Sequence, residues 1–567
     1  MLIRKKKTTT MIKNKYIYFA VVAMIIAGPA CKKQLNVGNP NQPTLAANVS
    51  TEAGLVAFVQ GSTFTDGFVN GDGWLGDTYF SLVYGFQDLL GDLTGADVAN
   101  QQVDVISRPD LVTTEDGTQI PNPSPQIASL RSYNTRASSG AGNNPFYYQW
   151  LNMYALNNAC NVILGIVPTI KFSGDAASRA ATVNAWCYWW KGYAYAAIGT
   201  MYYSGLIVDT AGKTNSNYLV HDSLIARSNY YFNLASSTVS GISSSSDYAT
   251  ILGELIPSAF QLGSLGGVPT QAQWVRNINT MLARNILLNH LNPFVNGAVN
   301  STIQKSTITP MTSADWQSML SLATSGIQNG DPVFTGSSSS TNSVFSPTGG
   351  NVAVNTTGPN SSTIFKITER LIQEFNTGDQ RVPNNFDTTL EFLDPNFTTR
   401  WSLDNGGNGI NNVVVLGNKT AGAYQVYIAS SYEENALMLA EANIMLGNTD
   451  PGLAFVDAVR AYQGAGVAAV SGTGLTQAQA LTQVTRERRA ALVFRGISWY
   501  DARRWGWSYS TSNGGGSYGN MYITQTGTIY HNTTIDYDFL DYWDVPADES
   551  VLNPPGSGSA ATVNPNF

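Results

Sequence analysis

The adjacent acids Glu433 and Glu434 are the first residues to test for chemistry, because glycosidases work with two carboxyl groups. A retaining glycosidase holds its carboxyls about 5 Å apart across a sugar. Neighbouring residues on a helix point about 100° apart, and the sequence around this pair has helical periodicity. We therefore interpret both acids as structural, paired with arginines such as Arg488 or Arg489, and we predict no catalytic residue.

Metal and nucleophile motifs give no better lead. No HExxH, CxxC or P-loop motif occurs, and no GxSxG lies in the strand–turn–helix context that a hydrolase needs. The run Asn70–Gly73 lacks the ligand ladder and terminal glutamate of an EF-hand, so we interpret it as a turn. Cys160 and Cys187 lie in apolar helical stretches and are expected to be buried free thiols. Three histidines lie far apart without partner spacing: His221, His290 and His531. We predict no metal site and no cofactor.

Aromatic rings in polar, Gly/Asn-rich surroundings offer binding chemistry instead. Their faces can stack on sugar rings, while Asn, Gln and Arg side chains bond the hydroxyl groups. The rings in such surroundings are Trp74, Tyr133, Trp401, Trp507, Tyr509 and Tyr518. The alternative for each ring is that it pins a loop onto the body of the protein. The predicted ligand-binding residues are Trp74, Asn100, Gln101, Arg131, Tyr133 and Trp401.

The elements that must position these residues are mostly helices, since apolar residues recur at helical spacing. The predicted helices are Glu52–Gly61, Gly73–Asp92, Phe146–Val167, Trp186–Tyr203, Gln271–Leu291, Tyr432–Leu446, Leu453–Tyr462 and Arg486–Gly506. Tyr432–Leu446 and Leu453–Tyr462 resemble a tetratricopeptide pair. Core positions are predicted for Trp150, Trp186, Trp189, Trp190, Trp274 and Trp499. Long loops are predicted at Leu93–Asn144, Thr335–Thr363 and Ser508–Thr528, and an extended segment at Asp541–Pro555.

The first 30 residues have the composition of a secretory leader. Six basic and no acidic residues come first, and an apolar run from Tyr16 to Ala30 ends at Cys31. Met11 also precedes enough basic residues to begin such a leader. The apolar run is shorter than the about 20 residues of a membrane span. We predict a lipoprotein signal with acylation at Cys31; the alternative is an ordinary signal peptide with an incidental cysteine.

The overall composition excludes one class of partner. The net charge is −7 with this basic leader included, so nothing favours binding to nucleic acid phosphates. Charged residues make up only 12% of the chain, while Asn, Ser, Thr, Gly, Tyr and Trp are abundant. Such a neutral, aromatic surface suits sugar or peptide ligands.

The segment Arg486–Gly506, RERRAALVFRGISWYDARRWG, is predicted to be one long helix with its basic end at the C-terminus. A glycine inside a helix costs about 1 kcal/mol relative to alanine. Gly496 is therefore expected where another backbone comes close.

This segment resembles the C-terminal signature of the SusD/RagB family, outer-membrane lipoproteins that capture nutrients. The matching residues are Glu487, Arg488, Arg489, Leu492, Phe494, Gly496, Asp501, Arg504, Trp505 and Gly506. Ala491 and Arg495 stand where the signature has acidic residues, and Ser498 stands where it has a basic one. Weaker similarities follow in family order at Gln273–Leu288, Gly378–Val382 and the C-terminal tail.

The resemblance implies a mainly α, SusD-like fold with tetratricopeptide-like helix pairs, large loop insertions and little β structure. Residues 31–567 would form a single domain, helical over about 31–330 and loop-rich over 331–567, with the signature helix at 486–506. In family members, ligand contacts come partly from the early loop region that corresponds to Leu93–Asn144.

The function implied by the resemblance is capture without catalysis. A lipid-anchored, surface-exposed protein of the outer membrane would bind oligosaccharide and hand it to a SusC-like TonB-dependent transporter. Three alternatives stay open at this point: a RagB-like peptide binder of the same fold, a secreted glycosidase, and a purely structural protein without a saturable ligand.

Overall fold

The computed structural model describes residues 49–63, 85–96, 105–106, 108–136, 144–256, 261, 265–291, 307, 309–337, 365–388, 392–394, 397–403 and 425–567. Several predictions lie outside the described residues: the leader, the acylation site Cys31, the Asn70–Gly73 turn, and the ligand residues Trp74, Asn100 and Gln101. No helix in the described part of the chain is both long and apolar enough to cross a membrane.

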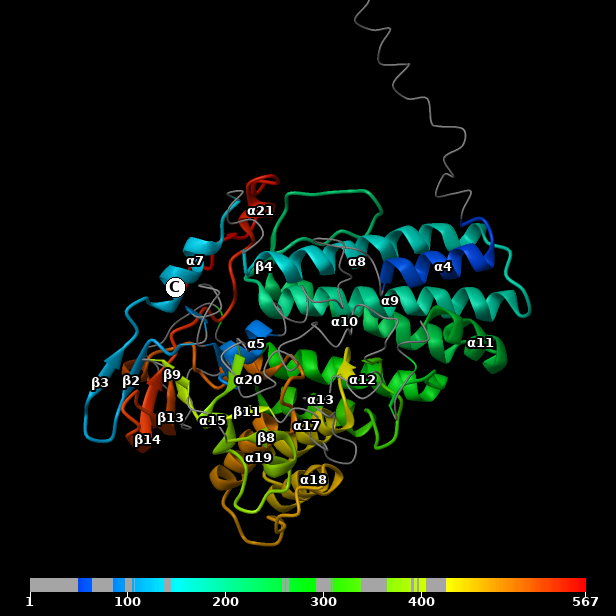
Figure 1. The fold of residues 1–567 in the computed structure, drawn as a ribbon. Helices are drawn as coiled ribbons and strands as arrows, with labels where there is room; N and C mark the ends of the chain where they lie inside the picture. Colours follow the sequence, from blue (N-terminus) through cyan, green and yellow to red (C-terminus); the bar gives the residue numbers. More distant parts are fainter. Residues whose placement is uncertain are drawn as a thin grey trace, which may run out of the picture.

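Helices form the body of the protein and pack on one another in sequence order (Figure 1). The first layer holds α4 (Glu52–Thr63), α8 (Tyr147–Ile166), α9 (Ala176–Met201), α10 (His221–Ser240) and α11 (Ser245–Leu255). The second holds α12 (Gln271–Leu288), α13 (Ser313–Thr324), α17 (Tyr432–Met445), α18 (Thr449–Tyr462), α19 (Gln477–Ala491) and α20 (Ser498–Arg504). Helix α8 packs on α9, α9 on α10, α10 on α12, α12 on α13, α13 on α17, and α17 on both α18 and α19. The predicted mainly α fold with helix pairs is confirmed.

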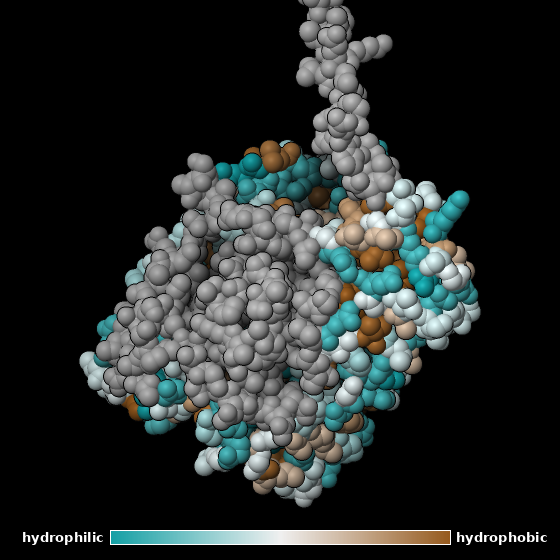
Figure 2. Space-filling model, turned by 45° about the vertical axis from the view of Figure 1, so that its right-hand side comes forward, coloured by the Kyte–Doolittle hydropathy of each residue, from teal (hydrophilic) through white to brown (hydrophobic). Residues whose placement is uncertain are grey.

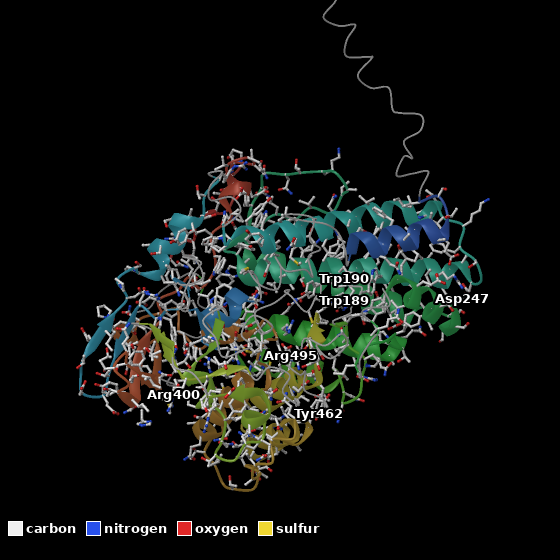
Figure 3. The ribbon with its side chains drawn as sticks, viewed as in Figure 1. Trp189, Trp190, Asp247, Arg400, Tyr462 and Arg495 are labelled. Carbon is white, nitrogen blue, oxygen red and sulfur yellow. The ribbon has the colours of Figure 1, made fainter. Side chains whose placement is uncertain are left out.

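Small residues and aromatic rings explain why the first layer packs so closely. A Cβ atom on Gly192 of α9 would lie 2.8 Å from the Phe232 ring of α10, so the glycine makes room for that ring. Trp186, Trp189 and Trp190 of α9 are fully buried, as predicted. Figure 3 shows Trp189 and Trp190 inside the helical body. Trp150, Trp274 and Trp499 are buried as well.

The predicted helix over Arg486–Gly506 is wrong as one element. Helix α19 ends at Ala491 and α20 begins at Ser498. Between them Phe494 and Gly496 adopt left-handed backbone conformations, with φ of 57° and 67°. A glycine adopts such a conformation without steric penalty, so Gly496 serves the turn and not a close helix contact. Across the turn, Arg488 Nε bonds Asp501 Oδ2 at 2.8 Å.

The predicted loops also contain short strands and helices. A four-stranded antiparallel sheet has the order β13 (Ser517–Ile523), β14 (Ile529–Asp536), β2 (Leu111–Thr113) and β3 (Gln119–Pro121). The loop predictions for Leu93–Asn144 and Ser508–Thr528 are therefore wrong in these parts, and α7 (Gln126–Tyr133) lies in the first of them. Two-stranded pairs join β1 (Thr94–Ala96) to β7 (Phe365–Ile367), β4 (Ser204–Gly205) to β5 (Leu219–Val220), β6 (Thr335–Ser337) to β12 (Gln425–Tyr427), β8 (Phe386–Asp387) to β11 (Ser402–Leu403), and β9 (Phe392–Asp394) to β10 (Phe397–Thr399).

Short helices complete the described chain: α5 (Gly85–Leu90), α15 (Glu369–Ile372), α16 (Arg381–Asn385) and α21 (Ala547–Ser550). One cluster of buried hydrophobic residues extends from Leu55 to Val545 and includes both helical layers. On the described part of the face in Figure 2, hydrophilic and hydrophobic residues are intermixed. Cys160 and Cys187 are buried free thiols, as predicted.

The acids Glu433 and Glu434 are structural and pair with arginines, although the partners differ from those predicted. Glu434 accepts a bidentate pair from Arg284 at 2.7 and 2.6 Å. Glu433 is fully buried, with its Oε1 3.5 Å from Nη2 of Arg495. Neither pairs with Arg488, which bonds Asp501 instead.

Candidate functional site

A groove of about 750 Å³ opens between α19 and strand β13 and lies beside the sequence signature. We call it the aromatic groove. Its lining combines aromatic rings with hydroxyl, amide and basic groups: Gln373, Glu374, Ala478, Leu481, Thr482, Thr485, Arg486, Arg489, Trp505, Trp507, Ser517, Tyr518, Gly519, Asn520, Met521 and His531. Its volume lies within the roughly 300–1,000 Å³ of typical ligand sites.

The base of the aromatic groove is rigid. Trp507 is only 5% exposed, and its ring stacks on Tyr537 with centroids 4.8 Å apart and planes 7° apart. The Arg489 guanidinium lies over the Trp507 ring, 4.9 Å from the ring centroid. Arg489 is fixed in turn by the carbonyls of Gly91 and Asp92, at 2.7 and 3.0 Å. These contacts hold Trp507 before any ligand arrives.

Strand β13 presents the outer ring. Tyr518 is 40% exposed, the most exposed aromatic side chain of the groove. The strand pairing with β14 is irregular on either side of Asn520, and Gly519 has a φ of 72°. Gln373 fixes this irregularity, since its Oε1 accepts the Met521 N–H at 2.6 Å. The bulge therefore places Tyr518 at the rim while the strand stays anchored.

Charge along the groove is mixed and close to balanced. Glu374 lies between Arg489 Nε at 3.0 Å and Arg486 Nε at 3.5 Å. Burial raises the pKa of Glu374 above its ordinary value, while both arginines act to lower it. Arg486 is partly exposed and also donates to the Gln373 carbonyl at 2.9 Å. An aromatic base with a polar rim of this kind suits a neutral polyhydroxylated ligand more than a strongly charged one.

Two further observations concern metal binding and the acid considered for catalysis. No group of three or more His, Cys, Asp or Glu side chains in the described ranges could hold a metal ion. Glu434, the acid considered for glycosidase chemistry, is 2% exposed and is bonded to Arg284 and to the Ser430 hydroxyl.

Three of the predicted ligand-binding residues lie in the described part of the chain, and none of the three lines the aromatic groove. Arg131, on α7, pairs with Asp544 at 2.8 Å and donates to the carbonyls of Asn564 and Phe567. Tyr133, on the same helix, is half-buried. Trp401 is also half-buried, and its indole N–H donates to Glu369 at 3.2 Å.

Of these three residues, Trp401 is the one that side-chain contacts connect to the aromatic groove. Its neighbour Arg400 bonds the same Glu369, and Arg400 Nη2 lies 4.0 Å from the sulfur of Met521, a groove residue. The structure therefore connects the Trp401 segment to the groove but places Arg131 and Tyr133 against the C-terminal segment.

Sequence reasoning found part of the groove. Trp507 and Tyr518 were among the aromatic residues in polar surroundings, whereas Trp505 was assigned only to the signature. Thr482, Thr485 and Gln373 were missed. The repeated Trp505-Gly506-Trp507 after a helix was the available signal, because aromatics that follow a helix end need not continue its buried stripe.

Comparison with known proteins agrees with this architecture. The SusD family profile matches residues 432–555, which extend from α17 to α21. No protein of curated function matches the chain. A SusD-like carbohydrate-binding protein from Bacteroides vulgatus has a TM-score of 0.50 at 13% identity, over 89% of this chain and 96% of that one. A SusD homolog from Bacteroides thetaiotaomicron has a TM-score of 0.53 at 13% identity, over 89% and 97%.

A further solved structure, which contains a xylogluco-oligosaccharide, has a TM-score of 0.51 at 14% identity, over 89% of this chain and 98% of that one. At such identities the likeness establishes the fold. The resemblance to the SusD/RagB family is confirmed: residues 432–555 match the SusD family profile, and the chain as a whole has the SusD fold.

Proposed function

We propose that this protein captures oligosaccharide at the cell surface and delivers it to a SusC-like TonB-dependent transporter. The observation that supports this most directly is the aromatic groove, with Trp505, Trp507 and Tyr518 beside hydroxyl and amide groups, in a chain with the SusD fold. One structural relative is described as a carbohydrate-binding protein and another contains a xylogluco-oligosaccharide.

The mechanism proposed is binding on a preformed surface. Trp507 cannot move without breaking its contacts to Tyr537 and Arg489, so little conformational freedom is lost when a sugar ring arrives. Tyr518 at the rim would supply the ring face on which the sugar stacks, because Tyr537 and Arg489 already cover the Trp507 ring. Thr482, Thr485 and Arg486 on α19 would bond its hydroxyl groups.

The membrane attachment proposed is a lipid anchor on Cys31. One acyl chain gives only reversible binding, and stable anchoring needs more than one. A multiply acylated cysteine at the mature N-terminus would hold the protein to the outer membrane. Intact-mass measurement of the membrane-extracted protein checks this, and an unacylated mature chain would contradict it.

The predicted ligand residues Trp74, Asn100, Gln101, Arg131, Tyr133 and Trp401 remain proposed contacts for a longer glycan. Trp401 is the one whose segment the structure connects to the aromatic groove. If the glycan extends from the groove along this segment, Trp401→Ala weakens binding of long oligosaccharides more than that of short ones.

Titration calorimetry against xylogluco-oligosaccharides and other defined oligosaccharides tests the proposal. Tyr518→Ala is expected to weaken binding of the preferred glycan about tenfold, the effect of losing roughly 1.4 kcal/mol of contact. The matched control is Tyr230→Ala, which removes a tyrosine that is 51% exposed on α10 and lies outside the groove. Equal loss in both variants would contradict a role for the groove.

Two rival functions give different outcomes in the same assay. A RagB-like peptide binder retains peptides from a mixed peptide library and ignores every glycan. A glycosidase releases shorter sugars from a bound polysaccharide and loses that activity in Glu434→Gln; the pairing of Glu434 with Arg284 argues against this outcome.

A further inference from the structure

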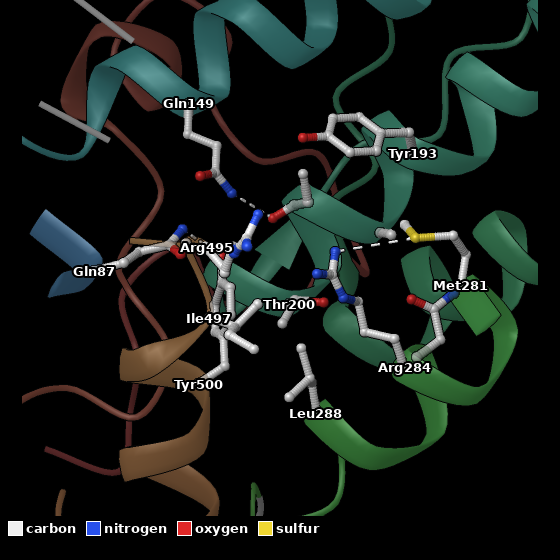
Figure 4. Close-up of a pocket in the computed structure, with 14 residues that line it drawn as sticks. Gln87, Gln149, Tyr193, Thr200, Met281, Arg284, Leu288, Arg495, Ile497 and Tyr500 are labelled. Atoms are coloured by element: carbon white, nitrogen blue, oxygen red, sulfur yellow. Dashed lines mark hydrogen bonds between the residues drawn. The ribbon is translucent and has the colours of Figure 1, made fainter. Parts of the chain in front are cut away.

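A second cavity, much smaller than the aromatic groove, lies where α8, α9 and α12 meet the turn between α19 and α20 (Figure 4). Its volume is about 50 Å³. The wall contains two arginines and several amide or hydroxyl groups: Gln87, Gln149, Tyr193, Thr200, Arg284, Asn285, Arg495 and Tyr500. We call it the arginine cavity.

The two guanidinium groups enter the arginine cavity from different elements. Arg284 comes from α12 and Arg495 from the turn after α19, and Figure 4 shows both directed into the same space. Arg284 holds Glu434 with Nε and Nη2. Arg495 has only a loose pair with Glu433, at 3.5 Å from Nη2, and its guanidinium carbon lies 3.2 Å from the centre of the Tyr427 ring.

Arg495 has an unsatisfied donor. Its side chain is 7% exposed, and Nη1 has no hydrogen-bond partner among the described residues. A buried charged group without its hydrogen bonds costs more than a neutral one, because desolvation is not compensated. A native structure therefore calls for a partner at Nη1, and the arginine cavity is the space available for it.

The charges of the residues around the arginine cavity indicate which kind of partner it can hold. The described residues of its wall include no carboxylate; Glu433 and Glu434 contact the arginines from outside the lining. The neighbouring acid Asp88 adds little negative charge at neutral pH, since burial raises its pKa to about 8. Two guanidinium groups repel a metal cation. In the remaining wall, the hydroxyl groups of Thr200 and Tyr500 accept hydrogen bonds from neighbouring amides and can each donate one.

The volume of the arginine cavity limits the size of the ligand. A water needs about 10–15 Å³ of such space, so 50 Å³ accommodates one small ion with few waters and excludes a sugar ring. We propose that the arginine cavity is a binding site for a small monovalent anion, chloride or a carboxylate of about the size of acetate, held between Arg284 and Arg495.

The proposed anion site depends on an arginine that departs from the SusD signature. Arg495 stands where the SusD signature has an acidic residue, so the positive charge in the turn is a departure from the signature. Glu433 already balances much of that charge, and the anion would supply the hydrogen-bond partner that Nη1 lacks and tie the turn to α12. The inference does not depend on the glycan proposal, because none of the described residues lines both the arginine cavity and the aromatic groove.

Bromide, an anomalous scatterer of the same charge as chloride, is the direct probe. Crystals of the wild-type protein soaked in sodium bromide are expected to show an anomalous peak at hydrogen-bonding distance from Arg495 Nη1, and crystals soaked in sodium acetate to show planar density there. Water in the cavity with neither signal would overturn the proposal.

Solution measurements use the same protein and separate the anion from general salt effects. At constant ionic strength, replacing gluconate by chloride or acetate is expected to raise the Tm of the wild type. Arg495→Gln should lose this response. Arg400→Gln, which changes a partly exposed arginine outside the cavity, should keep it.

A second variant guards against misfolding of Arg495→Gln. Gln87→Glu puts a carboxylate into the wall at nearly unchanged volume, so it should occupy the place of the anion and abolish both the bromide peak and the Tm response. An undiminished bromide peak in Gln87→Glu would contradict a site between the two arginines.

Discussion

Helices α9 and α10 meet through glycine and aromatic rings, whereas α19 meets its neighbours through buried arginine–carboxylate pairs. At the first contact the spacing is set by Gly192 against Phe232. At the second, Glu487 of α19 accepts from Arg381 at 2.5 Å and from Arg460 at 2.8 Å, and all three side chains are at most 5% exposed.

This difference has a physical consequence for specificity. Apolar packing tolerates substitution when volume is kept, but a buried charge tolerates the loss of its partner poorly. A second group of buried pairs joins Asp501 to Arg488 at 2.8 Å and to Arg504 at 2.7 Å, and Arg504 also pairs with Glu441 at 2.6 Å. The second layer, whose helix α19 lines the aromatic groove, is therefore held by ion pairs with a defined geometry. The first layer is held by the shape complementarity of its side chains.

The largest expected effect comes from breaking the Glu487 pairs. Glu487→Gln keeps the shape but leaves Arg381 and Arg460 short of a negative charge, and we expect a loss of about 3–5 kcal/mol in the free energy of unfolding. Urea denaturation measures it. Glu115→Gln, at an exposed acid in the β2–β3 turn, should change stability little; a similar loss in both variants would show that the network does not dominate.

Helical periodicity in the sequence predicted α8, α9, α12, α17 and α18, because their buried stripes are aromatic or aliphatic. Helices α10, α11 and α13 were not predicted. Serine, asparagine and threonine are frequent in α10, and these residues are weak helix formers. Packing against α9 and α12 stabilises α10, and that contact is not visible in a local window.

The signature segment shows the limit of periodicity more sharply. Its apolar spacing continues through the turn at 492–497, so the pattern predicted one helix. Asp501 folds back to pair with Arg488 of α19, and this pairing requires the break; the pair of Asp501 with Arg504 lies within α20. The aromatic groove was missed as a unit for a similar reason: it exists only because β13 lies against α19, a contact that no sequence spacing encodes.

An intermediate effect is expected at the α9–α10 contact. Gly192→Ala puts a Cβ atom 2.8 to 2.9 Å from the Phe232 ring, and overpacking of this kind costs about 1–3 kcal/mol. The higher helix propensity of alanine offsets at most about 1 kcal/mol of this cost. Thermal unfolding should therefore show that Gly192→Ala is less stable than the wild type.

The matched control for Gly192→Ala is Gly165→Ala in α8, where an added Cβ meets nothing within 4 Å. This variant should be stabilised by about 0.5–1 kcal/mol. If both variants become more stable, shape complementarity is not what fixes the first layer.

The last prediction concerns the acid that stands apart from the arginine network, and its effect is a dependence of stability on pH. Asp88 of α5 is 1% exposed, lies 3.1 Å from the Ser498 hydroxyl and forms no ion pair among the described residues. Burial raises its pKa to about 8. Because the folded protein then holds a proton that the unfolded chain releases near pH 4, this stabilisation is complete below about pH 4 and falls until pH 8.

Asp88→Asn imitates the protonated acid and should remove that dependence. The slope attributable to one such group is at most about 1.4 kcal/mol per pH unit, measured by urea denaturation between pH 5 and 8. The wild type should lose stability relative to Asp88→Asn as the pH rises. A constant difference between the two proteins over this range would mean that Asp88 is ionised in the fold, and that the fold stabilises this buried carboxylate although no described arginine is paired with it.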